Sequence, residues 1–139
     1  MSQLYPFIFT SAKKEKRIIV SCTAGELHEI GPRMVADFFE MEGWNSYYFG
    51  ANTPQTSLIK AIESYKPDVL AVSVTMSYNL SSVSDLIESV KSQSNIGDVK
   101  ILVGGYPFNL SGKLWKNMGA DGFAMDAAGA VKIANSLIN

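Results

Sequence analysis

The sequence has few of the residues that mark secreted, membrane or nucleic-acid-binding proteins. Its 139 residues include one cysteine, Cys22, which excludes an intramolecular disulfide and favours a reducing compartment. No apolar run approaches the roughly 20 residues that cross a bilayer. The apolar start at residues 4–9 lacks a basic leader and a cleavage site for secretion. We therefore expect a cytoplasmic protein that contacts no membrane.

The chain also carries no large excess of positive or negative charge. The formal net charge is −1, and no basic run is longer than residues 13–17. This is too little to form a nucleic-acid footprint, so we expect no direct contact with nucleic acid. The chain is 47% apolar and long enough for one buried core. We divide it into an N-terminal lead, residues 1–15, and one domain, residues 16–139.

Short β-branched runs alternate with longer amphipathic segments along this domain. The runs, which predict strands, are residues 17–21, 45–49, 69–74, 100–103 and 122–124. Helices are predicted over 31–42, from Thr53-Pro54 onward, and over 82–94, 110–118 and 126–138. In residues 31–42 the apolar side chains, Met34, Val35, Phe38, Phe39 and Met41, predict one broad inward face.

Strict alternation of strand and helix predicts an α/β fold. We expect a doubly wound, flavodoxin-like sheet of five parallel strands, with helices on both faces. Sheets of this kind bind ligands outside the carboxyl ends of their strands, near the point where the strand order reverses. The loops that follow the predicted strands are therefore where a site is expected.

The loop after the first strand carries the only histidine of the chain, His28. Glu26 precedes it by two residues, and Gly31 follows three residues later. A carboxylate so close to an imidazole can orient it as a metal ligand. The alternative for this short motif alone is an ordinary solvent-exposed loop histidine.

The other strand ends carry small or polar residues. Ser73 and Thr75 follow the third strand, Gly104-Gly105 the fourth, and residues 124–127 the fifth. Glycines allow a ligand to approach the backbone closely. Several such loops on one edge predict a large, flat ligand with many contacts rather than a compact substrate.

These motifs and their spacing resemble the cobalamin (vitamin B12)-binding domain. Its signature is Asp-x-His-x-x-Gly, then Ser-x-Leu and then Gly-Gly, each at a characteristic distance from the one before. In this chain the segment 32–72 separates Gly31 from Ser73, and the segment 76–103 separates Thr75 from Gly104, which matches that spacing. The sequence Gly-Ala-Asp-Gly-Phe-Ala-x-Asp-Ala, ending at Ala127, is similar to the closing strand and loop of the family. The resemblance covers roughly residues 16–138.

The resemblance implies that His28 is the lower axial ligand of cobalt, in the arrangement called base-off/His-on. Glu26 would then accept a hydrogen bond from the other ring nitrogen. The displaced nucleotide tail of cobalamin would enter the edge of the sheet, with Ala124 and Asp126 near its buried base. The implied cofactor-binding residues are Glu26, Leu27, His28, Glu29, Ile30, Gly31, Ser73, Thr75, Ser77, Gly104, Gly105, Tyr106, Ala124 and Asp126.

Two positions depart from the family signature. Glu26 stands in place of Asp, a form similar to that of B12-dependent regulators and light sensors, and Thr75 stands in place of Leu. Members of the family usually carry a helical bundle before this domain, and residues 1–15 are too few to form one. We expect the cap to come from a longer chain or from a partner protein.

The functional expectation is a cobalamin-binding module, a sensor or carrier domain that is not catalytic alone. The alternative is the corrinoid subunit of a methyltransferase or mutase system. Two further alternatives keep the fold and change the ligand: haem held by the same histidine, or a flavin held by the turn at residues 21–25. A phosphoacceptor receiver domain is excluded, because the first and third strands end without the aspartates that it needs.

Overall fold

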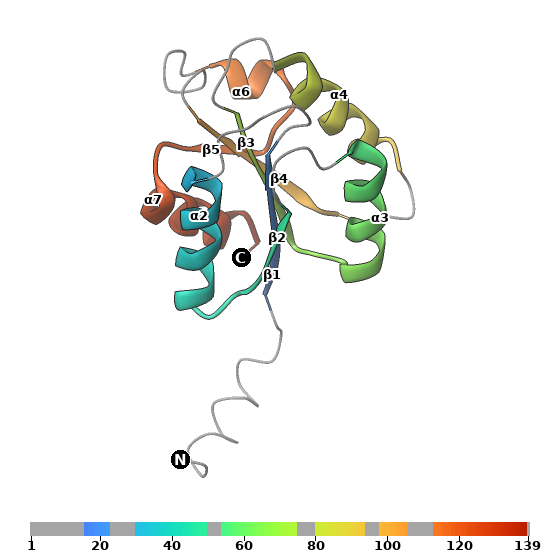
Figure 1. Cartoon of the computed structure of the whole chain (residues 1–139). Helices are drawn as coiled ribbons and strands as arrows, with labels where there is room; N and C mark the ends of the chain where they lie inside the picture. The colour runs from blue at the N-terminus through green and yellow to red at the C-terminus, as the bar shows by residue number, and fades with distance from the viewer. Residues whose placement is uncertain are drawn as a thin grey trace.

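Five short strands form one parallel sheet in the computed structural model of the chain (Figure 1). The structure describes residues 16–22, 30–49, 54–74, 80–93, 98–105 and 113–138. The strands are β1 (Arg17–Cys22), β2 (Asn45–Phe49), β3 (Val69–Ser73), β4 (Lys100–Gly104) and β5 (Gly122–Ala124), in the order β2-β1-β3-β4-β5. The helices are α2 (Ile30–Met41), α3 (Gln55–Tyr65), α4 (Leu80–Lys91), α6 (Leu114–Asn117) and α7 (Ala127–Ile138).

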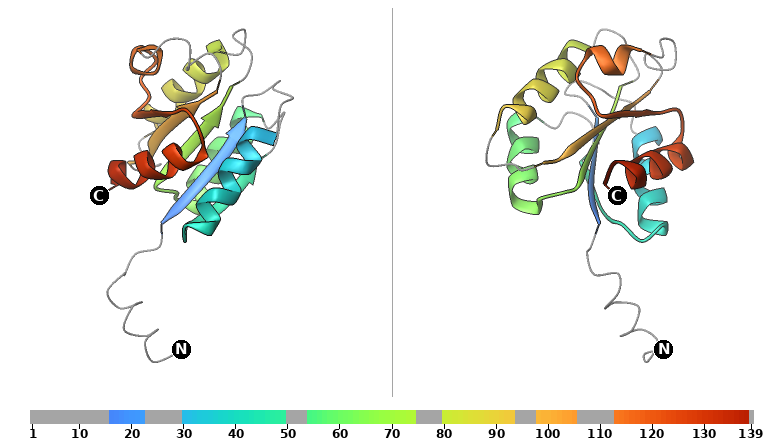
Figure 2. Two further views of the ribbon diagram at one scale, coloured as in Figure 1. Left: turned by 90° about the vertical axis from the view of Figure 1, so that its left-hand side faces the viewer. Right: turned by 180° about the vertical axis from the view of Figure 1, so that it is seen from behind.

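Helices cover both faces of the sheet (Figures 1 and 2). Helices α2 and α7 pack on one face, where Phe39 and Ala134 are fully buried. Helices α3 and α4 pack on the other, where Ile62 and Val83 are fully buried. Because β3 is enclosed on both faces, its first four residues are all buried, as its continuous apolar sequence predicts. The predicted fold class is confirmed.

The strand order reverses at β1, which lies between β2 and β3. The chain passes from β1 through α2 to β2 on one side of β1, and later returns through α3 to β3 on the other side. In sheets of this type, ligands bind at the carboxyl ends of the strands where the order reverses. The register brings four residues side by side along the carboxyl edge: Cys22 pairs with Ser73, Ser73 with Gly104, and Gly104 with Ala124. The strand ends that the sequence singles out therefore meet on one edge.

Two aspartates fix the opposite, amino edge of the sheet. Asp68 Oδ2 accepts a hydrogen bond of 3.0 Å from the Arg17 N–H. Asp121 Oδ2 accepts one of 2.8 Å from the Ile101 N–H, and its other oxygen lies 3.1 Å from Lys91 Nζ. Each carboxylate ties the residue before one strand to the start of its neighbour, which holds the register that aligns the carboxyl edge.

Several helix ends differ from the sequence prediction. Helix α3 begins at Gln55, with Pro54 rather than Thr53 directly before it. Helix α4 spans Leu80–Lys91 instead of 82–94, and its first turn packs Leu80 and the fully buried Val83 against the core. Of the helix predicted over 110–118, the described part is helical only over Leu114–Asn117. Strand ends agree within one residue, and for the inner strands β3 and β4 burial on both faces limits the apolar run.

The predicted inward face of α2 is wrong in part. Phe39 is fully buried, but Met34, Phe38 and Met41 are 58%, 36% and 76% exposed. The helix rests on the sheet through a narrow stripe that includes the small Ala36. An apolar pattern wider than that stripe leaves its outer members in solvent.

Candidate functional site

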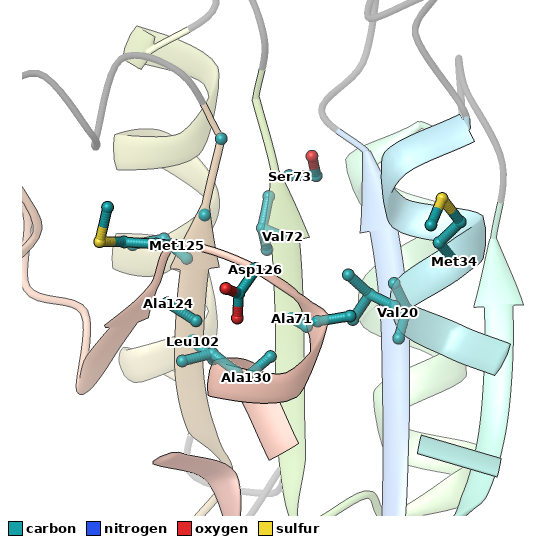
Figure 3. Close-up of a pocket in the computed structure, with 15 residues that line it drawn as sticks. Val20, Met34, Ala71, Val72, Ser73, Leu102, Ala124, Met125, Asp126 and Ala130 are labelled. Carbon is teal, nitrogen blue, oxygen red and sulfur yellow. The ribbon is translucent and has the colours of Figure 1, made fainter. Parts of the chain in front are cut away.

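A cavity of about 310 Å³ opens at the carboxyl edge, between the sheet and helices α2 and α7. Val20, Ala71 and Leu102 come from three adjacent strands and form its sheet side (Figure 3). Val35 of α2 and Ala130 of α7 form part of its helix side. Small alanines at two of these positions leave the space that larger core residues would fill. Ligand pockets of proteins span about 300–1,000 Å³, so this cavity can bury an aromatic group.

Polar groups stand where the cavity meets the carboxyl edge. Ser73 ends β3, and Asp126 lies between β5 and α7; both line the cavity (Figure 3). Asp126 Oδ1 accepts a hydrogen bond of 2.7 Å from the Gly129 N–H, so this carboxylate caps the first turn of α7. The cavity therefore joins apolar walls to a polar edge.

Gly104 and Gly105 line the cavity and also bring strand ends close together. A Cβ on Gly104 would lie 3.1 Å from the Ala124 carbonyl oxygen. A Cβ on Gly105, whose φ is +119°, would lie 1.8 Å from the Val74 carbonyl oxygen. The sequence interpretation assigns these glycines to ligand approach. The structure shows that neighbouring backbone already occupies the space beside them. Glycine is therefore needed at both positions first of all so that the ends of β3, β4 and β5 can pack closely.

The structure brings five of the predicted site residues together around the cavity: Ser73, Gly104, Gly105, Ala124 and Asp126. Ile30 and Gly31 form the start of α2. The remaining predicted residues, Glu26, Leu27, His28, Glu29, Thr75, Ser77 and Tyr106, lie outside the described residues. The role predicted for His28 therefore stays a prediction.

Sequence analysis missed most of the apolar wall. Val20, Ala71, Leu102 and Ala130 sit within ordinary strand and helix patterns, where nothing in the sequence separates a cavity wall from a packed core. Met34 and Met125 also line the cavity and are 58% and 69% exposed. The only sequence feature that could have indicated this wall is the small size of its alanines.

Within the described ranges, no three His, Cys, Asp or Glu side chains gather into a group that could hold a metal ion. In the same ranges, no helix is long and apolar enough to span a bilayer. What these residues do offer is a mostly apolar cavity with a polar edge. This arrangement can take a flat apolar group attached to a polar chain.

Comparison with known proteins identifies the family. The family model described as B12 binding domain matches residues 16–133. Dimethylamine corrinoid protein 3 of Methanosarcina acetivorans is 30% identical over 129 residues, which cover 91% of this chain and 59% of that protein. The chain thus spans little more than half the length of this relative.

Solved structures agree with the fold. The monomethylamine corrinoid protein of Methanosarcina barkeri matches with a TM-score of 0.80 and 25% identity, over 96% of this chain and 63% of that one. A chain of the methanol:cobalamin methyltransferase complex from the same organism matches with a TM-score of 0.79 and 19% identity, over 98% of this chain and 52% of that one. Together with the family match, these findings show that the chain belongs to the B12-binding domain family and that its cofactor is cobalamin.

Proposed function

We propose that this chain is the cobalamin-carrying part of a corrinoid protein that serves a methyltransferase. The observation that carries the proposal is the cavity at the carboxyl edge, where an apolar interior and a polar rim coincide with the strand reversal. The names of the relatives support the methyltransferase setting: a dimethylamine corrinoid protein, a monomethylamine corrinoid protein and a methanol:cobalamin methyltransferase complex. They favour the second of the two expectations from sequence, the corrinoid subunit, over a sensor.

The cavity is the proposed seat of the nucleotide tail. Ala71, Leu102 and Ala130 exclude water and offer apolar surface to a planar base. Ser73, at the carboxyl end of β3, offers a hydroxyl that can donate to or accept from the polar part of the tail. Ala71, Ser73 and Leu102 come from the adjacent strands β3 and β4, and Ala130 comes from α7, so packed elements hold all four in place before the ligand arrives.

His28 is the proposed lower ligand of cobalt. Its loop joins the carboxyl end of β1 to the start of α2, and Cys22 at that end pairs with Ser73 in the sheet. Neutral imidazole is a suitable nitrogen donor for cobalt. Glu26 would fix the imidazole tautomer by accepting a hydrogen bond from the N–H of the ring nitrogen that does not bind cobalt. When bound, cobalamin supplies a cobalt centre that can accept and release a methyl group.

The proposal also includes partners and a location. A methyltransferase subunit would deliver or receive the methyl group, and a helical domain or partner protein would cap the exposed face of the corrin. The single cysteine supports a reducing compartment, and we propose the cytoplasm.

Replacement of the histidine tests the proposed lower ligand. The variant His28→Ala, loaded with hydroxocobalamin, should lose the absorbance bands of nitrogen-coordinated cobalt. It should still retain some corrin, because the tail cavity is untouched. Unchanged spectra in this variant would contradict the assignment of His28 to cobalt.

A separate test addresses the carrier role. We expect the gene beside this one to encode a methyltransferase, and the loaded chain to change its absorbance when that enzyme and its methyl donor are added. A neighbouring gene for a DNA-binding or signalling protein, with no spectral change on addition of methyl donors, would favour a sensor instead.

A further inference from the structure

Two methionines stand where the cavity at the carboxyl edge opens to solvent. Met34 belongs to α2 and Met125 lies between β5 and α7, and Figure 3 shows them on opposite sides of the strand end that carries Ser73. Both line the cavity, yet their side chains are 58% and 69% exposed. Within the described part of the chain, five large hydrophobic side chains are exposed, and only these two also line the cavity. Exposed apolar surface beside polar residues is typical of a ligand-binding groove.

The backbone is held in place at both methionines, while their side chains extend into solvent. Met34 is part of α2, which the buried Ala36 fixes to the sheet. Met125 directly precedes Asp126, whose carboxylate accepts the Gly129 N–H at 2.7 Å and caps α7. A methionine side chain is unbranched and has three rotatable bonds, so it adapts to the shape of what it covers. Each side chain can therefore turn over the opening without a change in the fold.

A bound group would give these side chains an apolar surface to cover. Ala71 and Leu102 on the sheet and Ala130 on α7 form inner walls of the cavity. A planar base seated against them would still meet water at the opening. If Met34 and Met125 turned over that base, apolar surface of the base and of both side chains would leave water together, which favours the closed arrangement.

The sulfur atoms make such a closure sensitive to oxidation. Hydrogen peroxide transfers one oxygen atom to the thioether sulfur, which forms a sulfoxide and releases water; the sulfur loses two electrons and the peroxide gains them. The sulfoxide is polar, so its burial against an apolar base costs free energy. Exposure of Met34 and Met125 in the empty cavity leaves both sulfurs open to this reaction.

We propose that Met34 and Met125 close the opening of the cavity over the bound nucleotide tail of cobalamin, and that their oxidation by a peroxide loosens the cofactor. The inference rests on the proposed function, because it takes the cavity as the seat of the tail. It adds to that function a closure made by two side chains and a site of oxidative modification.

Methionine oxidation in the full chain, with and without hydroxocobalamin, tests the closure. Met41 is the internal reference: it ends α2, about 10 Å along the helix axis from Met34, is 76% exposed and does not line the cavity. Under dilute hydrogen peroxide, followed by mass spectrometry of peptides, we expect the cofactor to slow oxidation of Met34 and Met125 at least about fivefold. The rate at Met41 should stay the same. Cobinamide, which has the corrin ring but no nucleotide tail, should give no such protection.

The possible failures of this experiment differ from one another. If the unoxidised chain retains no corrin on gel filtration, the proposed function is wrong and the closure with it. If the chain retains cobalamin but Met34 and Met125 oxidise as fast as in the empty chain, the closure alone is overturned. Equal protection by cobinamide would also overturn it, since the corrin ring and not the tail would then lie under the methionines.

Leucine variants test the effect of oxidation on binding. Peroxide treatment of the empty chain should raise the dissociation constant for hydroxocobalamin at least about tenfold. The variant Met34→Leu/Met125→Leu keeps apolar side chains of similar size without sulfur, so its dissociation constant should be the same before and after treatment. The matched control Met41→Leu should remain as sensitive as the unaltered chain. A treated Met34→Leu/Met125→Leu chain that loses affinity would overturn the modification site, since another sulfur, such as that of Cys22, would then be responsible.

Discussion

Gly105 shows how one residue shapes the carboxyl edge. Its φ of +119° is disfavoured for any side chain, and a Cβ there would lie 1.8 Å from the Val74 carbonyl oxygen. We expect Gly105→Ala to lower the free energy of unfolding by about 3 kcal/mol or more, since backbone strain alone costs about 1–3 kcal/mol. Urea unfolding followed by circular dichroism measures the loss.

Gly43 provides the control for this prediction. Its φ is +92°, but no atom lies within 4 Å of the position that a Cβ would take. Gly43→Ala therefore carries the conformational cost without the clash. Equal stability of the two variants would show that the ends of β3 and β4 are not packed as described.

Asp126 lines the cavity and also stabilises the start of α7. Its carboxylate accepts the Gly129 N–H at 2.7 Å and caps α7. Asp126→Ala should lower the free energy of unfolding by about 1 kcal/mol, the usual cost of losing a helix cap. Asp126→Asn should keep most of that stability, because the amide oxygen can accept the same hydrogen bond. Thermal unfolding of the two variants measures the difference, and an Asn variant as unstable as the Ala variant would contradict the capping role.

At the residue scale, sequence reasoning succeeded for residue types and motifs that occur seldom in the chain. The only histidine, the only Gly-Gly pair and the Ser-x-Thr at residues 73–75 stand at the spacing of a known family, and Ser73 does pair with Gly104 at one edge. The prediction that Met34 and Met41 face inward failed, because the residue type alone does not distinguish a core position from a surface position. Only the contact between α2 and the sheet decides which of them is buried.

At the scale of elements, the cavity depends on small residues of α7 and the sheet. Ala130 of α7 is 4% exposed and lines the cavity, whereas Ala128 on the same helix is exposed and does not. Ala130→Leu should fill part of the space and raise the dissociation constant for hydroxocobalamin at least about tenfold, which corresponds to about 1.4 kcal/mol. Ala128→Leu adds the same atoms outside the cavity and should leave the constant unchanged. Titration by absorbance compares them, and unaltered binding by Ala130→Leu would remove the cavity from the proposed site.

Strands were predictable to within a residue and helix ends were not. Residues that are buried on both faces of a sheet must be apolar, so β1, β3 and β4 are recognisable as continuous apolar runs in the sequence. Helix ends depend on local geometry instead. Lys66 ends α3 in a left-handed conformation, with φ of 50°, which its residue type gave no reason to expect.

At the scale of the whole molecule, the strand order is what creates the site. Strands β2 and β3 lie on opposite sides of β1, and the carboxyl ends of β1, β3, β4 and β5 align in register. Alternation of strands and helices predicted a doubly wound parallel sheet from sequence, and the structure supplies the strand order. The cavity volume and its apolar wall were not predictable, because they arise from how far α2 and α7 stand from the sheet.

The most direct test of the account is cofactor retention. The chain is incubated with hydroxocobalamin, freed of unbound cofactor by gel filtration, and examined by absorbance beside a parallel sample incubated with haem. We predict that corrin bands stay with the protein at about one cofactor per chain, and that haem is not retained. Loss of all corrin on the column, or retention of haem alone, would contradict the assignment of the cavity and the carboxyl edge to cobalamin.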